Sequence, residues 1–216
     1  NRAGDVLIQV EADVDSEYDY ELLGYITPKK MGQAYHCPVF NGLSKQTTSE
    51  QLMDLGTQLN IHGIVPMFHV VGVTPEAADV HTAFLGRKDP PVVTITNEDL
   101  AQARAEISAG TGKADFCILG CPHLTINQVG SIAKMLDGQQ LAGQLYIFTS
   151  TSTKELAQRM GYLDIIHKAG GEIVINSCVD QPCWSHLYGM SGVTESPKCA
   201  YYTKRWNKTW IGTPRM

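Results

Sequence analysis

The chain has 216 residues, of which 43% are hydrophobic and 18% charged, a balance typical of one large or two small well-packed domains. Its net charge of -5 argues against nucleic acid as the main partner. No apolar run approaches the length of a membrane span and no signal peptide is visible, so we expect a cytoplasmic or organelle-matrix protein without a membrane partner.

The first half of the chain alternates between strand and helix patterns. Strands are expected at 5–10, 64–71 and 92–96, and helices at 16–25, 48–63, 75–85 and 98–108. Thr74 is a suitable N-cap for the third helix, since Pro75 and Glu76 fit the first helical positions. A loop is expected at 28–42, where Gly32, Pro38 and Gly42 interrupt both patterns.

The second half continues the same alternation after a turn at 110–112. Strands are expected at 114–121, 145–148 and 172–176, and helices at 125–136, 150–160 and 162–168. The basic tail, 204–216, reads as an irregular extension that is either solvated or in contact with missing partner chain. Short joints between alternating elements predict an α/β fold, with a mostly parallel sheet and helices on both faces.

Six cysteines are distributed along the chain without a C-x2-C pair, which argues against a structural zinc site. Their low density also differs from that of secreted disulfide scaffolds, so we expect reduced thiols. Cys117 is interpreted as a core residue, and structural roles are expected for Cys37 and Cys183. The remaining three thiols are those of Cys121, Cys178 and Cys199.

Three of the expected strands end in reactive groups, which include His69, Cys121 and Cys178, and a fourth group, 194–202, follows the last strand. Ligands of parallel sheets bind at the carboxyl ends of the strands, so these groups are expected to converge. Two or three thiolates with nearby oxygen and nitrogen donors suit an iron–sulfur cluster better than zinc.

Each of these residues also has a structural interpretation. A lone cysteine is often a small buried hydrophobe, a histidine at a strand end is often a satisfied structural group, and Thr74 most simply caps a helix. Ser196 and Lys198 could be a turn serine and a surface lysine. A hydrolase with Cys121 as nucleophile and His123 as base is a further alternative, although side chains two positions apart on a strand end would point apart.

Four motifs together resemble the aconitase X family, a divergent branch of the aconitase superfamily. The motifs lie at 68–77 (FHVVGVTPEA), 119–123 (LGCPH), 176–178 (NSC) and 194–202 (T-x-S-x-K-x-A-x-Y), in the family's order. The resemblance extends from Asn1 to about Tyr202. The family has a further N-terminal segment and a small swivelling domain, fused or separate, which are not recognisable here. The resemblance therefore implies an aconitase-like fold that forms the C-terminal half of a larger catalytic unit.

The resemblance implies an iron–sulfur-dependent dehydratase acting on a small carboxylate. Two activities are known in the family, and dehydration of cis-3-hydroxy-L-proline to a pyrroline-2-carboxylate is expected here, with mevalonate 5-phosphate dehydration as the alternative. A non-catalytic subunit or fragment is a third possibility. The expected organisation is an N-terminal α/β connecting segment, 1–63, a cluster-binding α/β region, 64–203, and the tail, 204–216.

The match to the family's motifs also implies roles for individual residues. Cys121 and Cys178 are the expected cluster ligands, and Cys199 is a candidate for the third position. Ser196 is the expected base, and Lys198 either lowers its pKa or holds the substrate carboxylate. The expected substrate-binding residues are His69, Thr74 and His123.

Overall fold

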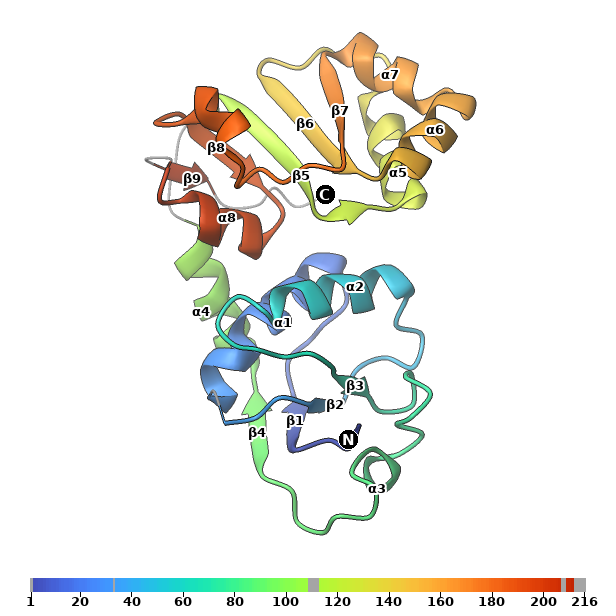
Figure 1. Cartoon of the computed structure of the whole chain (residues 1–216), viewed down its shortest axis with the longest axis vertical. Coiled ribbons are helices and arrows are strands. Elements are labelled where there is room, and N and C mark those ends of the chain that lie inside the picture. The colour runs from blue at the N-terminus through green and yellow to red at the C-terminus, as the bar shows by residue number, and fades with distance from the viewer. Residues whose placement is uncertain (1, 33, 109–112, 207–208, 212–216) are drawn as a thin grey trace. The chain divides into compact units, whose positions relative to one another are not determined.

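The computed structural model describes residues 2–32, 34–108, 113–206 and 209–211, so the turn expected at 110–112 lies outside the described residues. The chain divides into two compact α/β units, Asn1–Glu106 and Ile107–Met216 (Figure 1). Every strand pairing in either unit is parallel among the described residues. The expected parallel α/β architecture is confirmed, but it comprises two sheets in place of one.

The first unit contains a sheet of strand order β3-β2-β1-β4. Its elements are β1 (Val6–Val10), α1 (Glu17–Met31), β2 (Pro38–Asn41), α2 (Ser49–Gln58), β3 (His69–Val70), α3 (Val80–Ala83), β4 (Val92–Ile95) and α4 (Asn97–Ile107). The boundary expected between residues 63 and 64 lies inside this unit, because β3 pairs with β2, and β4 pairs with β1. A hydrophobic pattern identifies strands but not their neighbours, so it could not place the boundary.

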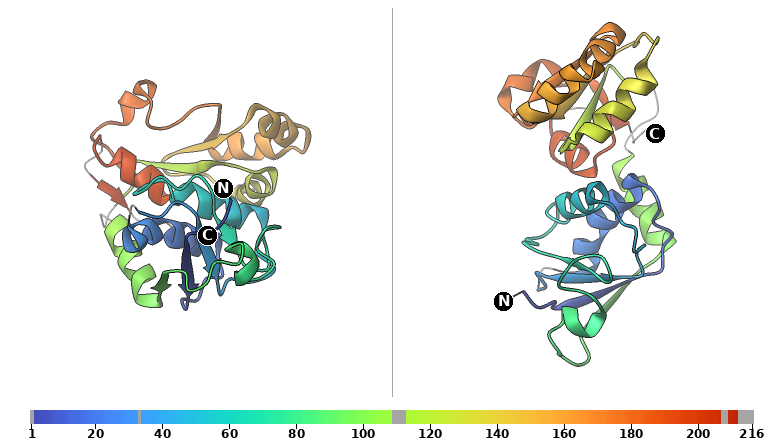
Figure 2. Two further views of the ribbon diagram at one scale, coloured as in Figure 1. Left: turned by 60° about the horizontal axis from the view of Figure 1, so that its bottom comes forward. Right: turned by 90° about the vertical axis from the view of Figure 1, so that its right-hand side faces the viewer.

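Helices cover both faces of the first sheet. Helices α1 and α2 lie together on one side and α3 lies on the other (Figures 1 and 2). On the α3 side, Val39 of β2 belongs to a buried cluster with Ala77, Ala83 and Phe84. Alternate residues of each strand therefore face different helices, as expected for a sheet buried on both sides.

Two stretches of the first unit differ from the expected pattern. Helix α1 continues through Pro28 to Met31, because its buried side chains pack along the length of the helix and Gly24 lets the backbone approach the Leu55 carbonyl of α2. Strand β2 forms within the expected loop, since Pro38 stands at its first position, where a missing N–H is tolerated.

The expected helix cap at Thr74 is wrong. The Thr74 hydroxyl contacts the backbone N–H and C=O of Val70 within a turn, at 3.0 and 3.2 Å. Helix α3 begins only at Val80 and is capped by Asp79, which accepts the N–H of Thr82 at 2.7 Å. A threonine before proline fits a turn as well as a helix start, so the motif alone could not distinguish them.

The second unit contains a sheet of strand order β7-β6-β5-β8-β9. Its elements are β5 (Phe116–Leu124), α5 (Ile126–Leu136), β6 (Gln144–Thr149), α6 (Thr151–Arg159), α7 (Tyr162–Ala169), β7 (Gly171–Ile175), the 3-10 helix η1 (Pro182–Leu187), β8 (Ser191–Thr194), α8 (Pro197–Thr203) and β9 (Thr209–Ile211). The tail is not irregular throughout, since β9 pairs with β8. Residues 207–208 and 212–216 of the tail lie outside the described part of the chain.

Helices α5, α6 and α7 pack on one face of the second sheet (Figures 1 and 2). Leu145 and Ile147 of β6 share a buried cluster there with residues of all three helices. On the other face, the Trp184 ring of η1 lies 5.1 Å, between ring centroids, from both Tyr146 and Phe148. Among the described residues, no helix has the length and apolar character needed to cross a membrane.

The sequence suggests that β5 ends at Cys121, but the strand continues to Leu124. Its pairing with β6 is regular as far as Leu119, shifts in register, and resumes where Leu124 pairs with Thr149. The buried Thr149 hydroxyl donates to the Leu124 carbonyl at 2.6 Å. This bond fixes the far side of an irregular stretch that contains Cys121.

We expect Thr149→Val to lower the free energy of unfolding of the second unit by about 1–3 kcal/mol, because the Leu124 carbonyl loses its side-chain donor while the side-chain volume is kept. Urea unfolding followed by tryptophan fluorescence measures this unit, since all three tryptophans lie beyond residue 107. Thr149→Ser keeps the hydroxyl and serves as the control. Equal stability of Thr149→Val and the wild type would show that the bond contributes nothing.

Candidate metal and active site

The strand order of the second sheet reverses between β5 and β8, and the region at the carboxyl ends of these two strands is called the β5–β8 crevice below. From β5 the chain first adds β6 and β7 on one side, and then returns to place β8 on the other. Ligands of open parallel sheets bind where the order reverses in this way. Ile118 and Thr194 form the last residue pair between β5 and β8. Beyond this pair, β5 carries Cys121, and β8 is followed by Glu195 and Ser196.

The backbone at the end of β5 leaves the regular ladder at Gly120. This residue has φ +108°, and a Cβ at this position would lie 2.3 Å from the carbonyl oxygen of Phe148. Only glycine fits such a position without strain. The Cys121–Pro122 peptide bond that follows is cis. Cys121 therefore lies in an irregular segment at the crevice.

Two consecutive residues after β8 hold this segment. The Glu195 carboxylate accepts the N–H of Gly120 at 2.5 Å and also accepts the N–H of Cys121. The buried Ser196 hydroxyl donates to the Cys121 carbonyl at 2.5 Å and accepts the N–H of Cys199 at 3.3 Å, which caps α8. The N–H groups of Gly120 and Cys121 and the carbonyl of Cys121 are thus all hydrogen-bonded to these two side chains.

Three thiols from separate elements are near enough to influence one another. Burial raises the pKa of Cys121 to about 11, while the Ser196 hydrogen bond and the Lys198 charge oppose this shift. Burial is the main cause that raises the pKa of Cys199 well above its usual value, and the charge of the neighbouring Cys121 adds to it. The charge of Cys178 also raises the pKa of Cys121 and of Cys199. The thiols of Cys121, Cys178 and Cys199 therefore lie within range of one another's charge, and their role as cluster ligands stays a prediction.

The loop that carries Cys178 is anchored to the same crevice. His123 lies with Nε2 2.8 Å from the Ser177 carbonyl, and Nε2 must be the protonated nitrogen because a carbonyl only accepts. Further along the loop, Arg205 Nη2 donates to both carboxylate oxygens of Asp180, at 2.6 and 2.7 Å. The indole N–H of Trp206 donates to the same carboxylate. His123 thus contacts the peptide before Cys178, whereas the sequence suggests a substrate contact.

His69 and Thr74, also expected at the site, lie in the first unit. The His69 ring is buried, its Nε2 is 2.8 Å from the carbonyl of Arg2, and its Nδ1 is 3.9 Å from Glu76. Strand β3, which begins at His69, belongs to a different sheet from β5 and β7. Strand ends that look equivalent in sequence therefore need not share an edge.

Glu195 is the residue of this site that the sequence patterns do not single out. It keeps part of its surface accessible, but burial of its carboxyl raises its pKa to about 7, and the N–H groups of Gly120 and Cys121 counteract the rise. The only available signal is its position between two motif residues, Thr194 and Ser196. Its contacts depend on β8, a strand too short to be recognised from its sequence.

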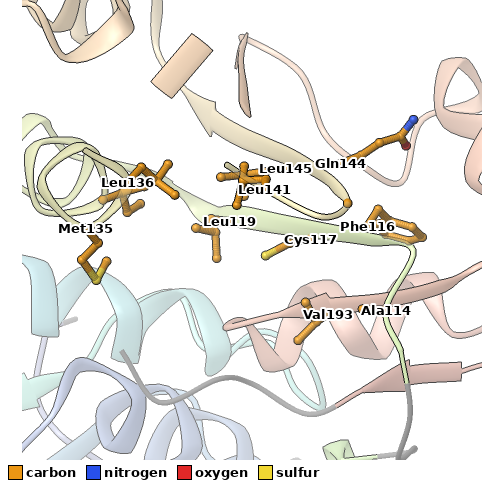
Figure 3. A pocket seen from close by; sticks show the side chains of 12 residues that line it. Ala114, Phe116, Cys117, Leu119, Met135, Leu136, Leu141, Gln144, Leu145 and Val193 are labelled. Carbon is orange, nitrogen blue, oxygen red and sulfur yellow. The ribbon is translucent and has the colours of Figure 1, made fainter. Parts of the chain in front are cut away.

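An apolar cavity of about 350 Å³ lies elsewhere in the second unit (Figure 3). Its lining includes Cys117, Leu119 and Val193, and none of its twelve lining residues is charged. Cys117 lies at the edge of the core, which agrees with its structural interpretation. A carboxylate would find no charged partner there, so this cavity is not the candidate active site.

Comparisons with known proteins match both units. The family model of the aconitase X second domain matches residues 4–105, and that of the third domain matches residues 114–214. The crystal structure of Thermococcus kodakaraensis aconitase X in its holo-form has a TM-score of 0.83 and 30% identity, and the match covers 95% of this chain and 51% of that one.

Two named enzymes show the range of relatives. The phosphomevalonate dehydratase large subunit of Methanothermobacter thermautotrophicus is 34% identical over 94% of this chain and 49% of its own length. The cis-3-hydroxy-L-proline dehydratase of Pseudomonas aeruginosa is 32% identical over 84% of this chain and 32% of its own length. The chain thus spans about half the length of the first of these relatives and about a third of the second. It belongs to the aconitase X family, of which it carries the second and third domains.

Proposed function

We propose that the protein containing this chain is a hydro-lyase that removes water from a small hydroxy acid with an iron–sulfur cluster as cofactor. The observation that carries the proposal is the grouping of Cys121, Cys178 and Cys199 at the β5–β8 crevice of an aconitase X chain. The names of the relatives support the reaction class, since both printed activities are dehydrations.

The donor set of the crevice fits a cluster better than a single ion. Thiolates are soft ligands that suit iron–sulfur clusters. In the part of the chain that the structure describes, no three His, Cys, Asp or Glu side chains are placed to hold one metal ion. A cluster is broader than an ion and can bridge more widely spaced thiols. When bound, it would supply a Lewis acid that weakens the bond to the leaving hydroxyl.

The chain's own residues would bind the substrate and move its proton. Lys198 lies near Cys121, where its charge favours the thiolate, and it is our candidate for holding the substrate carboxylate. Ser196 is our candidate base for the proton on the carbon next to that carboxylate. To act, its hydroxyl must exchange its contact with the Cys121 carbonyl for one with the substrate. The proton and the released hydroxyl together form the water that leaves.

The other expected substrate contacts have different places in this proposal. His123 holds the Cys178 loop through the Ser177 carbonyl. The polar atoms of His69 and Thr74 contact backbone groups of the first unit, and a role for these two residues in substrate binding stays a prediction. The rest of the enzyme, including a small domain or subunit, would complete the active site.

The first substrate to test is mevalonate 5-phosphate, because phosphomevalonate dehydratase large subunits match 94% of this chain, against 84% for the bacterial cis-3-hydroxy-L-proline dehydratase. The second is cis-3-hydroxy-L-proline, which the sequence motifs suggest. Both carry a hydroxyl one carbon beyond the carbon that loses its proton, so one site chemistry serves either.

The test is to load the complete enzyme, with its small subunit where that is a separate chain, with iron and sulfide under anaerobic conditions. We expect NMR spectra to show the loss of water from one of the two substrates. After iron is removed, we expect no turnover. Cys183→Ser is the matched control, since Cys183 is an exposed thiol of η1 outside the site, and should leave turnover unchanged. A fully iron-loaded enzyme that dehydrates neither compound would contradict the proposal.

A further inference from the structure

Glu195 occupies an unusual place beside the candidate site. It follows the last residue of β8, and its carboxylate reaches across to β5 to accept the N–H groups of Gly120 and Cys121. These two groups lie in the segment where the β5–β6 register shifts, so regular pairing with β6 is interrupted there. Hydrogen bonds to a carboxylate are stronger than those between neutral groups.

We propose that Glu195 is a positioning residue that fixes the direction of the Cys121 thiol by holding the Gly120–Cys121 backbone. The effect on iron binding rests on the ligand role proposed above for Cys121, whereas the backbone contact of Glu195 does not depend on that role. Ser196 binds the carbonyl that follows, so Glu195 and Ser196 hold this backbone segment from its donor side and its acceptor side. Partners that orient metal ligands typically affect metal affinity by about 10–100-fold.

A second carboxylate makes a similar link between the same strands at their opposite ends. Asp115, just before β5, accepts the N–H of Ser191, the first residue of β8, at 2.9 Å. Asp115→Asn therefore removes a charged β5–β8 link without touching the Cys121 segment. It is the matched control for any general loosening of the sheet.

Two variants of Glu195 separate position from charge. Glu195→Gln keeps the length but directs an amide N–H₂ toward one of the two backbone donors. Glu195→Asp keeps the charge but is one methylene shorter, so it loses reach. If Glu195 acts only through its charge, Glu195→Asp will resemble the wild type. If it acts by position, both variants will fail.

The first measurement uses the metal-free full-length protein and needs no cluster. Iodoacetamide alkylation of Cys121, quantified by peptide mass spectrometry, should be faster in Glu195→Gln and Glu195→Asp than in the wild type and Asp115→Asn. In the iron-loaded enzyme, both Glu195 variants should lose iron to a chelator about 10–100-fold faster than Asp115→Asn. If no iron binds to the wild type, the cluster proposal fails while the alkylation result still decides this one.

If Cys121 is alkylated in either Glu195 variant at the same rate as in the wild type, the inference is overturned. Should a variant not fold, hydrogen exchange of the wild type decides the question. The amides of Gly120 and Cys121 should exchange far more slowly than exposed amides, because both donate to Glu195. Exchange at the rate of a free loop would equally overturn it.

Discussion

Replacing Cys121 with serine should remove iron from the enzyme and, with it, the dehydration activity. Serine is a poor donor to a soft cluster, so we expect iron affinity to fall by more than about 100-fold. The fold should persist, because the contacts with Glu195 and Ser196 are made by the backbone. Iron content, visible absorption and turnover of the complete enzyme measure the effect.

Cys183→Ser provides the comparison for this variant, since it removes an exposed thiol from the neighbouring η1. It should keep full iron and full turnover. If Cys121→Ser binds as much iron as Cys183→Ser, the ligand assignment of Cys121 is wrong and the remaining thiols of the site must be tested in its place.

Gly120→Ala should destabilise the second unit by about 2–4 kcal/mol. An alanine at φ +108° is strained, and its Cβ would lie 2.3 Å from the Phe148 carbonyl oxygen, which belongs to the backbone of β6 and cannot easily move. Urea unfolding followed by tryptophan fluorescence measures the loss. We expect iron binding to weaken in parallel, because Cys121 is the next residue.

Gly170→Ala separates strain from collision in this experiment. Gly170 ends α7 with φ +95°, and a Cβ there would meet nothing within 4 Å. Its substitution should cost only about 1 kcal/mol, from the left-handed conformation alone. Equal losses for the two variants would show that the approach of Gly120 to β6 is not tight in solution.

Most of the regular elements can be predicted from the sequence because parallel strands buried on both faces are short apolar runs bounded by caps. The helix expected at 125–136, for example, corresponds to α5, which Thr125 caps. Strands β2 and β8 cannot be predicted in this way. Their apolar runs are very short, and each forms because strands from elsewhere in the chain supply its hydrogen bonds.

The proximity of two of the thiols can be anticipated from the sequence, because Cys121 lies in β5 and Cys178 follows β7, a strand of the same sheet. The sequence alone does not reveal that β3, the strand of His69, pairs in the other sheet. It also misses Glu195, whose contact with Gly120 exists only once β5 and β8 are neighbours. Strand order is a long-range property, so it fixes which side chains meet and remains invisible to any local pattern.

The strand order of the second unit also has a consequence for biosynthesis. The bond from Ser196 to the Cys121 carbonyl joins residues 75 positions apart, and β6 and β7 are made between them. Contacts between such distant segments form late, since the intervening chain must first be ordered. On a ribosome, Cys121 would emerge well before the segment that holds it. We therefore expect the Cys121 segment to take its native conformation only after α8 has left the ribosome.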